Sequence, residues 1–263
     1  MNFKNKIVLI TGASSGIGWQ LAKDLADEGA QLALVARRTD LLESLSNEIK
    51  NKTKVIAYGC DVTKKDEVAK VFTQIKNDFG KIDIAILNSG VSITTKVTEY
   101  NSLAAENTLN TNVLGAVYFI ELLLTDFIAE KRGVIVGVSS LADGKGFPQS
   151  GFYSASKAAL TIMLESLRVE LKPHNVKVVT VKPGFVKTPM TDKNKFDMPF
   201  LMSVERGSKI IINGLKKEKR IIEFPIPTTL AVKFIRVIPT SWFEFIAGKI
   251  RIEKNKLSLV KMK

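Results

Sequence analysis

Short apolar runs alternate with longer amphipathic segments along most of the chain. The apolar runs predict strands at 6–10, 31–36, 54–59, 82–87, 133–139 and 176–182. The segments between them predict helices at about 17–28, 40–51, 64–79, 102–130 and 154–171. The strand runs are almost continuously apolar, which is typical of a parallel sheet that is covered by helices on both faces. The pattern therefore predicts one doubly wound, Rossmann-like α/β domain with a central parallel sheet and right-handed crossovers.

The regular alternation stops after about residue 187. Residues 188–202 mix proline, charged and apolar residues without a period, which predicts a long loop that is either functional or poorly ordered. A helix at about 204–217 and a short strand at 220–224 are expected to follow. We therefore assign residues 1–225 to the Rossmann-like domain and residues 226–263 to a C-terminal extension.

The C-terminal extension is predicted to be helical, amphipathic and basic. Its first helix would carry Leu230, Phe234, Val237 and Ile238 on one face and end at Pro239. Ser241-x-x-Glu244 matches a capping box that would start a second helix. Residues 216–263 hold twelve Lys/Arg and four Asp/Glu, so +8 of the total charge of +13 lies there. Such a segment favours either an anionic membrane surface or packing on the core or on another subunit.

Composition excludes several kinds of site. Cys60 is the one cysteine, so neither an internal disulfide nor a site of several cysteines can form. His174 is the one histidine and follows a proline near a predicted helix end, which argues against a Ser-His-Asp triad and against a histidine metal site. No metal is therefore expected, and acid–base chemistry must come from carboxylates, lysine or tyrosine.

Targeting signals are not evident in the sequence. No secretory signal and no uncharged apolar run of about 18 residues are found, so we expect a cytoplasmic protein, with attachment to the inner face of the membrane as the alternative. The charge of +13 also fits a nucleic-acid partner or a simple lysine-rich bias. Because no nucleic-acid-binding motif is recognisable, we expect no nucleic-acid partner.

A glycine-rich turn, TGASSGIG, joins the first predicted strand to the first helix. Gly12 permits a tight turn, Gly16 lets backbone amides approach a pyrophosphate, and Gly18 permits close helix–strand packing. The spacing G-x-x-x-G-x-G is one residue longer than G-x-G-x-x-G. Its place after the first of several strands favours a dinucleotide site over an ordinary turn.

Two arginines predict which dinucleotide binds. An acidic residue about 20 positions after the glycine turn would bind the ribose diol of NAD. The second strand instead ends in Arg37 and Arg38, and guanidinium groups suit a 2′-phosphate. We therefore expect a preference for NADP(H), with NAD(H) as the alternative cofactor.

Polar and glycine residues follow the next two predicted strands. Asp61 could accept a hydrogen bond from the adenine amine, and Gly90, in Asn88-Ser89-Gly90, could bring the backbone close to the adenosine ribose. Each taken alone is as good a turn residue. Both nevertheless lie at carboxyl ends of strands, where this architecture binds its ligand.

The pentapeptide YSASK places the Tyr153 phenol four residues before the Lys157 ammonium. Residues four apart share one face of a helix. A free phenol has a pKa of about 10, and a nearby ammonium favours the phenolate. The pair therefore suits acid–base chemistry. A tyrosine at a helix start and a solvated lysine are the alternative interpretation.

Two other polar residues fit the same chemistry. Ser140 ends the fifth predicted strand thirteen residues before Tyr153, and its hydroxyl could donate to an oxygen on which negative charge develops. Asn112 lies in a strongly apolar helix, where a buried amide needs partners.

Taken together, these residues resemble the short-chain dehydrogenase/reductase family. The resemblance extends over about residues 5–190, and one departure is Ser89 where the family commonly has alanine. It rests on TGASSGIG, Asp61, Asn88-Ser89-Gly90, Asn112, Ser140, Tyr153-x-x-x-Lys157 and Pro183-Gly184.

The resemblance implies a role for each candidate. Tyr153 would be the general acid in carbonyl reduction and the general base in alcohol oxidation. Lys157 would hold the nicotinamide ribose and lower the pKa of Tyr153, and Ser140 would bind the substrate oxygen. Asn112 would support a water chain to Lys157. The implied cofactor contacts are Gly12, Ser14, Ser15, Gly16, Ile17, Gly18, Arg37, Arg38, Asp61, Val62, Asn88, Gly90, Tyr153, Lys157, Pro183, Gly184, Val186 and Thr188.

The expected activity is NADP(H)-dependent interconversion of a carbonyl and a secondary alcohol. Residues 188–202 correspond to the family's substrate loop, and the apolar residues at 196 and 198–202 favour either a hydrophobic or lipid-like small molecule or ordinary packing of a long loop. The family resemblance also implies a homodimer or homotetramer, built on helices 102–130 and 154–171. The alternative is a catalytically silent dinucleotide-sensing regulator, or a membrane-surface scaffold, on the same fold.

Overall fold

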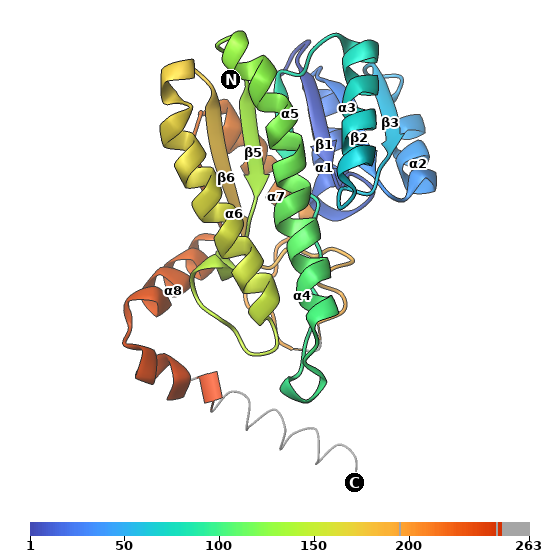
Figure 1. Cartoon of the computed structure of the whole chain (residues 1–263). Helices are drawn as coiled ribbons and strands as arrows, with labels where there is room; N and C mark the ends of the chain where they lie inside the picture. Colours follow the sequence, from blue (N-terminus) through green and yellow to red (C-terminus); the bar gives the residue numbers. More distant parts are fainter. Residues whose placement is uncertain (195, 246, 249–263) are drawn as a thin grey trace.

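The central element is a parallel β-sheet. The computed structural model describes residues 1–194, 196–245 and 247–248, and within them seven strands form one sheet in the order β3-β2-β1-β4-β5-β6-β7 (Figure 1). All pairs are parallel. The strands are β1 Ile7–Thr11, β2 Gln31–Ala36, β3 Val55–Gly59, β4 Ile84–Leu87, β5 Val134–Val138, β6 Lys177–Pro183 and β7 Ile221–Phe224. The predicted doubly wound parallel sheet is confirmed.

Helices cover both faces of the sheet and enclose two apolar cores. One core is formed with α1 (Gly16–Asp27), α2 (Thr39–Ile49) and α7 (Val204–Lys216). The other core is formed with α3 (Lys65–Phe79), α5 (Gly115–Ala129) and α6 (Gly151–Glu170). Because the inner strands have a core on either side, the residues of β1 and β5 are buried regardless of the face they occupy, which explains the continuous apolar runs.

The predicted helix 102–130 is interrupted. It consists of α4 (Ser102–Leu109), a π-helical turn (Asn110–Leu114) and α5. By length and composition alone, Ser102–Ala129 is apolar enough to cross a membrane. However, α4 contacts α6 and α5 contacts α3, and Phe119, Leu123 and Phe127 are buried in the core, as in a core helix of this fold.

The predicted loop at 188–202 is closed at its base. Val186 pairs with Met202, Lys187 N donates to Met202 O at 2.8 Å, and Met202 N donates to Phe185 O at 2.9 Å. Inside the loop, the Thr191 hydroxyl donates to Val186 O at 2.7 Å. These contacts tie both ends of the loop to the carboxyl end of β6.

The C-terminal extension begins with α8, Ile226–Val237. Its exposed face carries a stripe of apolar side chains, and Thr229 and Val232 are buried on the opposite side. The predicted apolar face is confirmed for three of its four residues. Ile238 is the exception, because it precedes Pro239 and has extended backbone outside the helix. The apolar stripe consists of Ile226, Leu230, Phe234 and Val237.

A second helical segment follows, and its predicted cap is wrong. Residues 240–245 are helical, and Pro239 O accepts from Trp242 N at 3.1 Å and from Phe243 N at 3.2 Å. Pro239 therefore occupies the cap position. Ser241 already lies inside the first turn, so it does not form the predicted capping box. The basic end of the extension, residues 249–263, lies outside the described residues.

Candidate active site

Tyr153 and Lys157 lie in the first two turns of α6, as the sequence predicts. The Lys157 ammonium lies over the Tyr153 ring, 5.8 Å from its centroid. Lys157 Nζ also donates to Val138 O, 2.8 Å away at the end of β5. The pair is thus held against the carboxyl edge of the sheet, and Lys157 is 4% exposed.

Burial changes the acidity of both groups. It lowers the pKa of Lys157 to about 8, because the charged ammonium loses hydration. Burial also raises the pKa of Tyr153, and a hydrogen bond with Ser140 offsets this in part. The net pKa of Tyr153 is therefore raised, and the expected lowering by Lys157 stays a prediction. Desolvation of the phenolate is the largest cause of this direction.

Ser140 stands directly after β5 and beside Tyr153. Its Oγ accepts from Ala142 N at 3.1 Å and so caps the 3₁₀ turn Leu141–Gly144. Ser140 is buried, and the same hydroxyl reaches the Tyr153 phenol. The serine therefore both caps the turn and belongs to the site.

Asn112 lies in the π-helical turn, and its side chain is fully engaged. Oδ1 accepts from Val91 N at 2.7 Å, and Nδ2 donates to Val91 O and to Ser156 Oγ, both at 2.9 Å. Such π-turns occur often at functional sites. These bonds show that Asn112 positions the chain after β4, and the water relay stays a prediction.

Gly90 lies close to the polar ends of Lys157 and Asn112. A Cβ at this position would lie 3.3 Å from Lys157 Nζ and 3.4 Å from Asn112 Oδ1. The sequence analysis predicted that Gly90 lies near the adenosine ribose of the cofactor. In the structure its neighbours are Lys157 and Asn112. The missing side chain leaves room for both polar groups.

The glycine turn leads into α1 in a conformation that needs glycine. Gly12 and Gly16 have φ of 66° and 60°. A Cβ on Gly18 would lie 2.5 Å from Gly12 O, so this position requires glycine for close packing. Asn88 Nδ2 donates to Thr11 O at 3.1 Å and to Gly12 O at 3.2 Å, which joins the turn to β4. Asn88 therefore shapes the turn.

The N-terminus of α1 suits an anion. The cap residue Ser15 makes no side-chain cap bond, and the first turn of α1 contains no acidic residue. Free amides and the helix dipole at such an end favour phosphate groups. The turn therefore fits the pyrophosphate of a dinucleotide.

The two arginines differ in position. Arg38 donates to Ser14 Oγ through Nε at 3.2 Å and through Nη2 at 3.0 Å, and Nη2 also lies 2.7 Å from Ser15 Oγ. Arg37 is mainly exposed, with Nη1 4.0 Å from Asp61 Oδ2. Arg38 thus belongs to the glycine turn, and Arg37 faces outward.

Other predicted cofactor residues occupy the rim and the core. The Thr188 side chain lies against Gly16, where a Cβ would meet Thr188 Cγ2 at 3.1 Å. Val62 is buried and packs closely on Gly115, so only its main chain could face a ligand. Ile17, in the first turn of α1, is partly buried and packs against the apolar core, and Val186 is buried. Pro183 ends β6, and Gly184 N donates to Phe224 O at 2.7 Å.

Ser156 links Asn112 to Tyr153, although the sequence analysis assigned it no role. Ser156 is fully buried, and its Oγ donates to Tyr153 O at 2.7 Å while accepting from Asn112. The only sequence signal was a hydroxyl between Tyr153 and Lys157. Asn112, Ser140, Tyr153 and Lys157 therefore converge at the carboxyl ends of β4 and β5.

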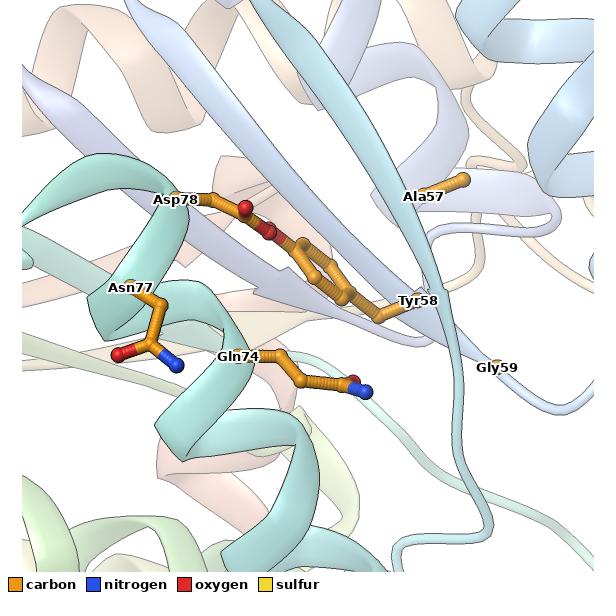
Figure 2. A pocket seen from close by; sticks show the side chains of 6 residues that line it. All are labelled: Ala57, Tyr58, Gly59, Gln74, Asn77 and Asp78. Atoms are coloured by element: carbon orange, nitrogen blue, oxygen red, sulfur yellow. The ribbon is translucent and has the colours of Figure 1, made fainter.

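A cavity of about 450 Å³ lies elsewhere, between β3 and α3 (Figure 2). The Tyr58 hydroxyl on its wall donates to Asp78 Oδ2 at 2.7 Å, and burial raises the pKa of this phenol. Tyr58 is therefore a structural donor. Among residues 1–194, 196–245 and 247–248, no group of three or more His, Cys, Asp or Glu side chains is placed to hold a metal ion.

Comparison with known proteins places these features in one family. The family model of short chain dehydrogenases matches residues 6–198. An uncharacterized oxidoreductase of Myxococcus xanthus is 34% identical over 247 residues, which cover 94% of this chain and 98% of that protein. An uncharacterized oxidoreductase of Listeria monocytogenes is 35% identical over 195 residues, or 73% of this chain and 79% of that protein.

Solved structures agree with the fold. A short-chain type dehydrogenase/reductase from Mycobacterium marinum is 27% identical, with a TM-score of 0.76 over 84% of this chain and 93% of its own. The arrangement of the sheet, the glycine turn and the Tyr153–Lys157 pair agrees with the family match. The chain therefore belongs to the short-chain dehydrogenase/reductase family of NAD(P)-dependent oxidoreductases.

Proposed function

We propose that this protein interconverts a carbonyl compound and a secondary alcohol, with NADP(H) as cofactor and Tyr153 as the proton donor and acceptor. The observation that carries the proposal is the convergence of Ser140, Tyr153 and Lys157 at one edge of the sheet. Residues 1–225 form the catalytic part in this proposal, and residues 226–263 form an extension.

Each residue has a step that follows from its position. The cofactor, when bound, supplies the hydride for reduction or accepts it in oxidation. Ser140 donates a hydrogen bond to the substrate oxygen, and Tyr153 transfers its phenolic proton to that oxygen as negative charge develops. A phenol with its ordinary pKa of about 10 is protonated at neutral pH, so Tyr153 can act as the proton donor in carbonyl reduction. Lys157 holds the ribose of the cofactor and favours the phenolate that remains after proton transfer.

Arg38 supports the preference for NADP(H). Its guanidinium already contacts Ser14 and Ser15 of the glycine turn, where a 2′-phosphate on the adenosine ribose would meet it. Structural relatives with the same fold are described in complex with either cofactor. One from Burkholderia phymatum holds NAD (20% identity, TM-score 0.81, covering 89% of this chain and 93% of its own), and one from Sphingobium yanoikuyae holds NADPH (23%, 0.78, 95% of each). NAD(H) is therefore the alternative.

The substrate in this proposal is hydrophobic or lipid-like. Phe200 and Leu201 in the 188–202 loop are exposed by 60% and 43%, although apolar side chains usually avoid water. An apolar ligand would cover them. A catalytically silent regulator is disfavoured, because a dinucleotide sensor would not need the linked proton-transfer groups.

The test is oxidation of NADPH with a panel of carbonyl compounds that includes long-chain 3-oxo compounds. Tyr153→Phe should abolish turnover and leave NADPH binding nearly unchanged. Tyr118→Phe removes a hydroxyl from α5 and is the matched control. Turnover by the Tyr153→Phe protein with any carbonyl would refute the proposed role of this residue.

For the extension, we propose attachment of a cytoplasmic homodimer or homotetramer to the inner, anionic membrane surface. The apolar stripe of α8 is exposed, with Phe234 at 67% and Leu230 at 62%, and Trp242 beyond it is 66% exposed. Residues 249–263 add six basic side chains against one acidic one. Apolar and aromatic residues flanked by basic groups suit the interface of anionic bilayers.

Flotation with phosphatidylserine-containing vesicles tests this attachment. Leu230→Asp with Phe234→Asp should abolish co-flotation, whereas Val97→Asp, at an exposed apolar position after β4, should not. Unchanged flotation of the double variant would refute a role of the stripe. A double variant that instead lowers the oligomeric state in sedimentation would assign the stripe to a second copy of the chain.

A further inference from the structure

Three charged side chains form an ionic cluster beside the proposed active site, in which Asp143 and Lys182 are buried and Arg236 is 32% exposed. The Asp143 side chain is 1% exposed, and Lys182 Nζ lies 2.9 Å from its Oδ2. Arg236 Nη2 donates to Oδ1 of the same carboxylate. Thr161 Oγ1 donates to Oδ2 at 2.7 Å. The mechanism proposed above uses none of these residues.

The cluster joins parts of the chain that are distant in sequence. Asp143 lies in the 3₁₀ turn after β5, Lys182 in β6, and Arg236 in the last turn of α8, which lies beside that turn (Figure 1). One carboxylate thus faces two cations. Removing Arg236 would leave the carboxylate with Lys182 and Thr161 on its Oδ2 side alone, so Oδ1 and the turn that carries it would lose their contact with α8.

Gly144 makes the approach of Arg236 possible. A Cβ at position 144 would collide with the Arg236 guanidinium, with Cζ at 2.5 Å and Nη2 at 2.7 Å. The φ of Gly144 does not lie in the left-handed region, so alanine would be tolerated by its backbone. Gly144→Ala should therefore displace the guanidinium without changing the arginine itself.

Hydrogen bonds lead from the cluster to both sides of the reactive pair. Asp143 N donates to Ser140 O at 3.2 Å, in the same turn whose Ala142 N binds Ser140 Oγ. On the other side, Thr161 Oγ1 lies 2.7 Å from Ser139 Oγ, which lies 2.9 Å from Lys157 O. Because a carboxylate only accepts, Thr161 donates to Asp143, and Ser139 donates either to Thr161 or to Lys157 O.

We infer that Arg236 of the C-terminal extension is a positioning residue that acts through Asp143 to hold the Ser140 turn in its reactive geometry. The inference rests on the proposed role of Ser140. It extends the functional site to α8, which lies outside residues 6–198 matched by the family model. A tether that merely stabilises α8 is the competing explanation.

Backbone amide hydrogen exchange tests the inference without a substrate. In Arg236→Ala and in Gly144→Ala, the amides of Ala142 and Asp143 should exchange at least about tenfold faster than in the unchanged protein. Lys233→Ala is the matched control, because Lys233 lies on the same helix and pairs with Glu223 at 2.6 Å on the surface. Equal protection of the Ser140 turn in all three variants would overturn the inference.

Kinetics separate a positioning role from general stability. Arg236→Ala and Gly144→Ala should each lower kcat by roughly 10- to 100-fold at saturating NADPH, with the Kd of NADPH within about twofold. Arg236→Lys should restore part of kcat. The double variant should be no worse than either single one, because both remove the same contact.

The contrary outcomes are distinct. If Tyr153→Phe is inactive but both variants keep kcat within about twofold, the inference fails and the proposed function stands. If both variants lose NADPH binding and kcat together, the cluster supports the whole domain, and the inference again fails.

If Tyr153→Phe retains turnover, the proposed function itself fails. The exchange experiment still shows whether Arg236 holds the Ser140 turn. If Arg236→Ala does not fold, the same exchange and kinetic measurements are made on Arg236→Lys and Gly144→Ala.

Discussion

The side-chain amide of Asn112 pairs with both backbone groups of Val91. Val91 N donates to Oδ1 at 2.7 Å, and Nδ2 donates to Val91 O at 2.9 Å. The π-helical turn on one side and the loop after β4 on the other are thereby held at a fixed spacing, with Lys157 next to the intervening Gly90.

Asn112→Ala should lower the free energy of unfolding by about 2–4 kcal/mol. The substitution removes three hydrogen bonds, two with Val91 and one with Ser156, and each such bond contributes about 0.5–1.5 kcal/mol. Urea unfolding measures the change. Asn101→Ala is the control, because it removes only a helix cap on α4 and should cost about 1 kcal/mol. Equal losses in the two variants would contradict the double pairing of Val91.

Gly18→Ala should remove dinucleotide binding. The added Cβ would lie 2.5 Å from Gly12 O and 2.6 Å from Asn88 Nδ2, so the glycine turn would have to move. Fluorescence titration with NADPH is expected to show at least about a tenfold higher Kd. Gly146→Ala is the control, since nothing lies within 4 Å of its added Cβ. Normal binding by Gly18→Ala would show that the turn tolerates displacement.

Arg38→Ala should weaken NADPH binding more than NADH binding. Only NADPH carries the 2′-phosphate, and a lost charge-assisted hydrogen bond corresponds to roughly a 10- to 100-fold higher KM. Arg37→Asp should also reduce the preference, but by less, because Arg38 contacts Ser14 and Ser15 of the glycine turn whereas Arg37 lies 4.0 Å from Asp61. Measured KM values for both cofactors decide this. An unchanged preference in both variants would refute the assignment of the 2′-phosphate to these arginines.

Lys157 should make stability rise with pH above about 8. Its pKa in the folded protein is about 8, below the ordinary value of 10.5, so between these values the unfolded chain binds a proton that the folded chain does not. Stability therefore increases with pH across this window, by on the order of 3 kcal/mol in total. Below pH 8 both states are protonated, and the burial cost of the ammonium is fully present.

The measurement is the free energy of unfolding at pH 7 to 10.5 for the unchanged protein and for Lys157→Met. The rise should be present in the first and absent from the second, because methionine has no titrating group. Parallel curves would show that the folded Lys157 has an ordinary pKa. Lys70→Met, at an exposed position of α3, controls for the loss of one positive charge.

The sequence by itself determined the order of the strands and helices, and it placed the ends of most of them to within a few residues. The reason is that a parallel sheet covered on both faces needs long apolar strands, and these runs are visible without tertiary information. The glycine turn, the Tyr153–Lys157 pair and Ser140 were recognisable for a related reason. Their spacing follows from local geometry, namely one turn of helix or one strand end.

Only the tertiary structure decided which groups touch one another. The pairing of Asn112 with Val91, the link through Ser156 and the contact of Arg236 with Asp143 join residues that are 21, 44 and 93 positions apart. It also decided the pKa directions of Tyr153 and Lys157, because burial depends on the elements packed around them. Hydrogen bonds and desolvation act over a few ångströms in space, so their partners and magnitudes appear only when the chain is folded.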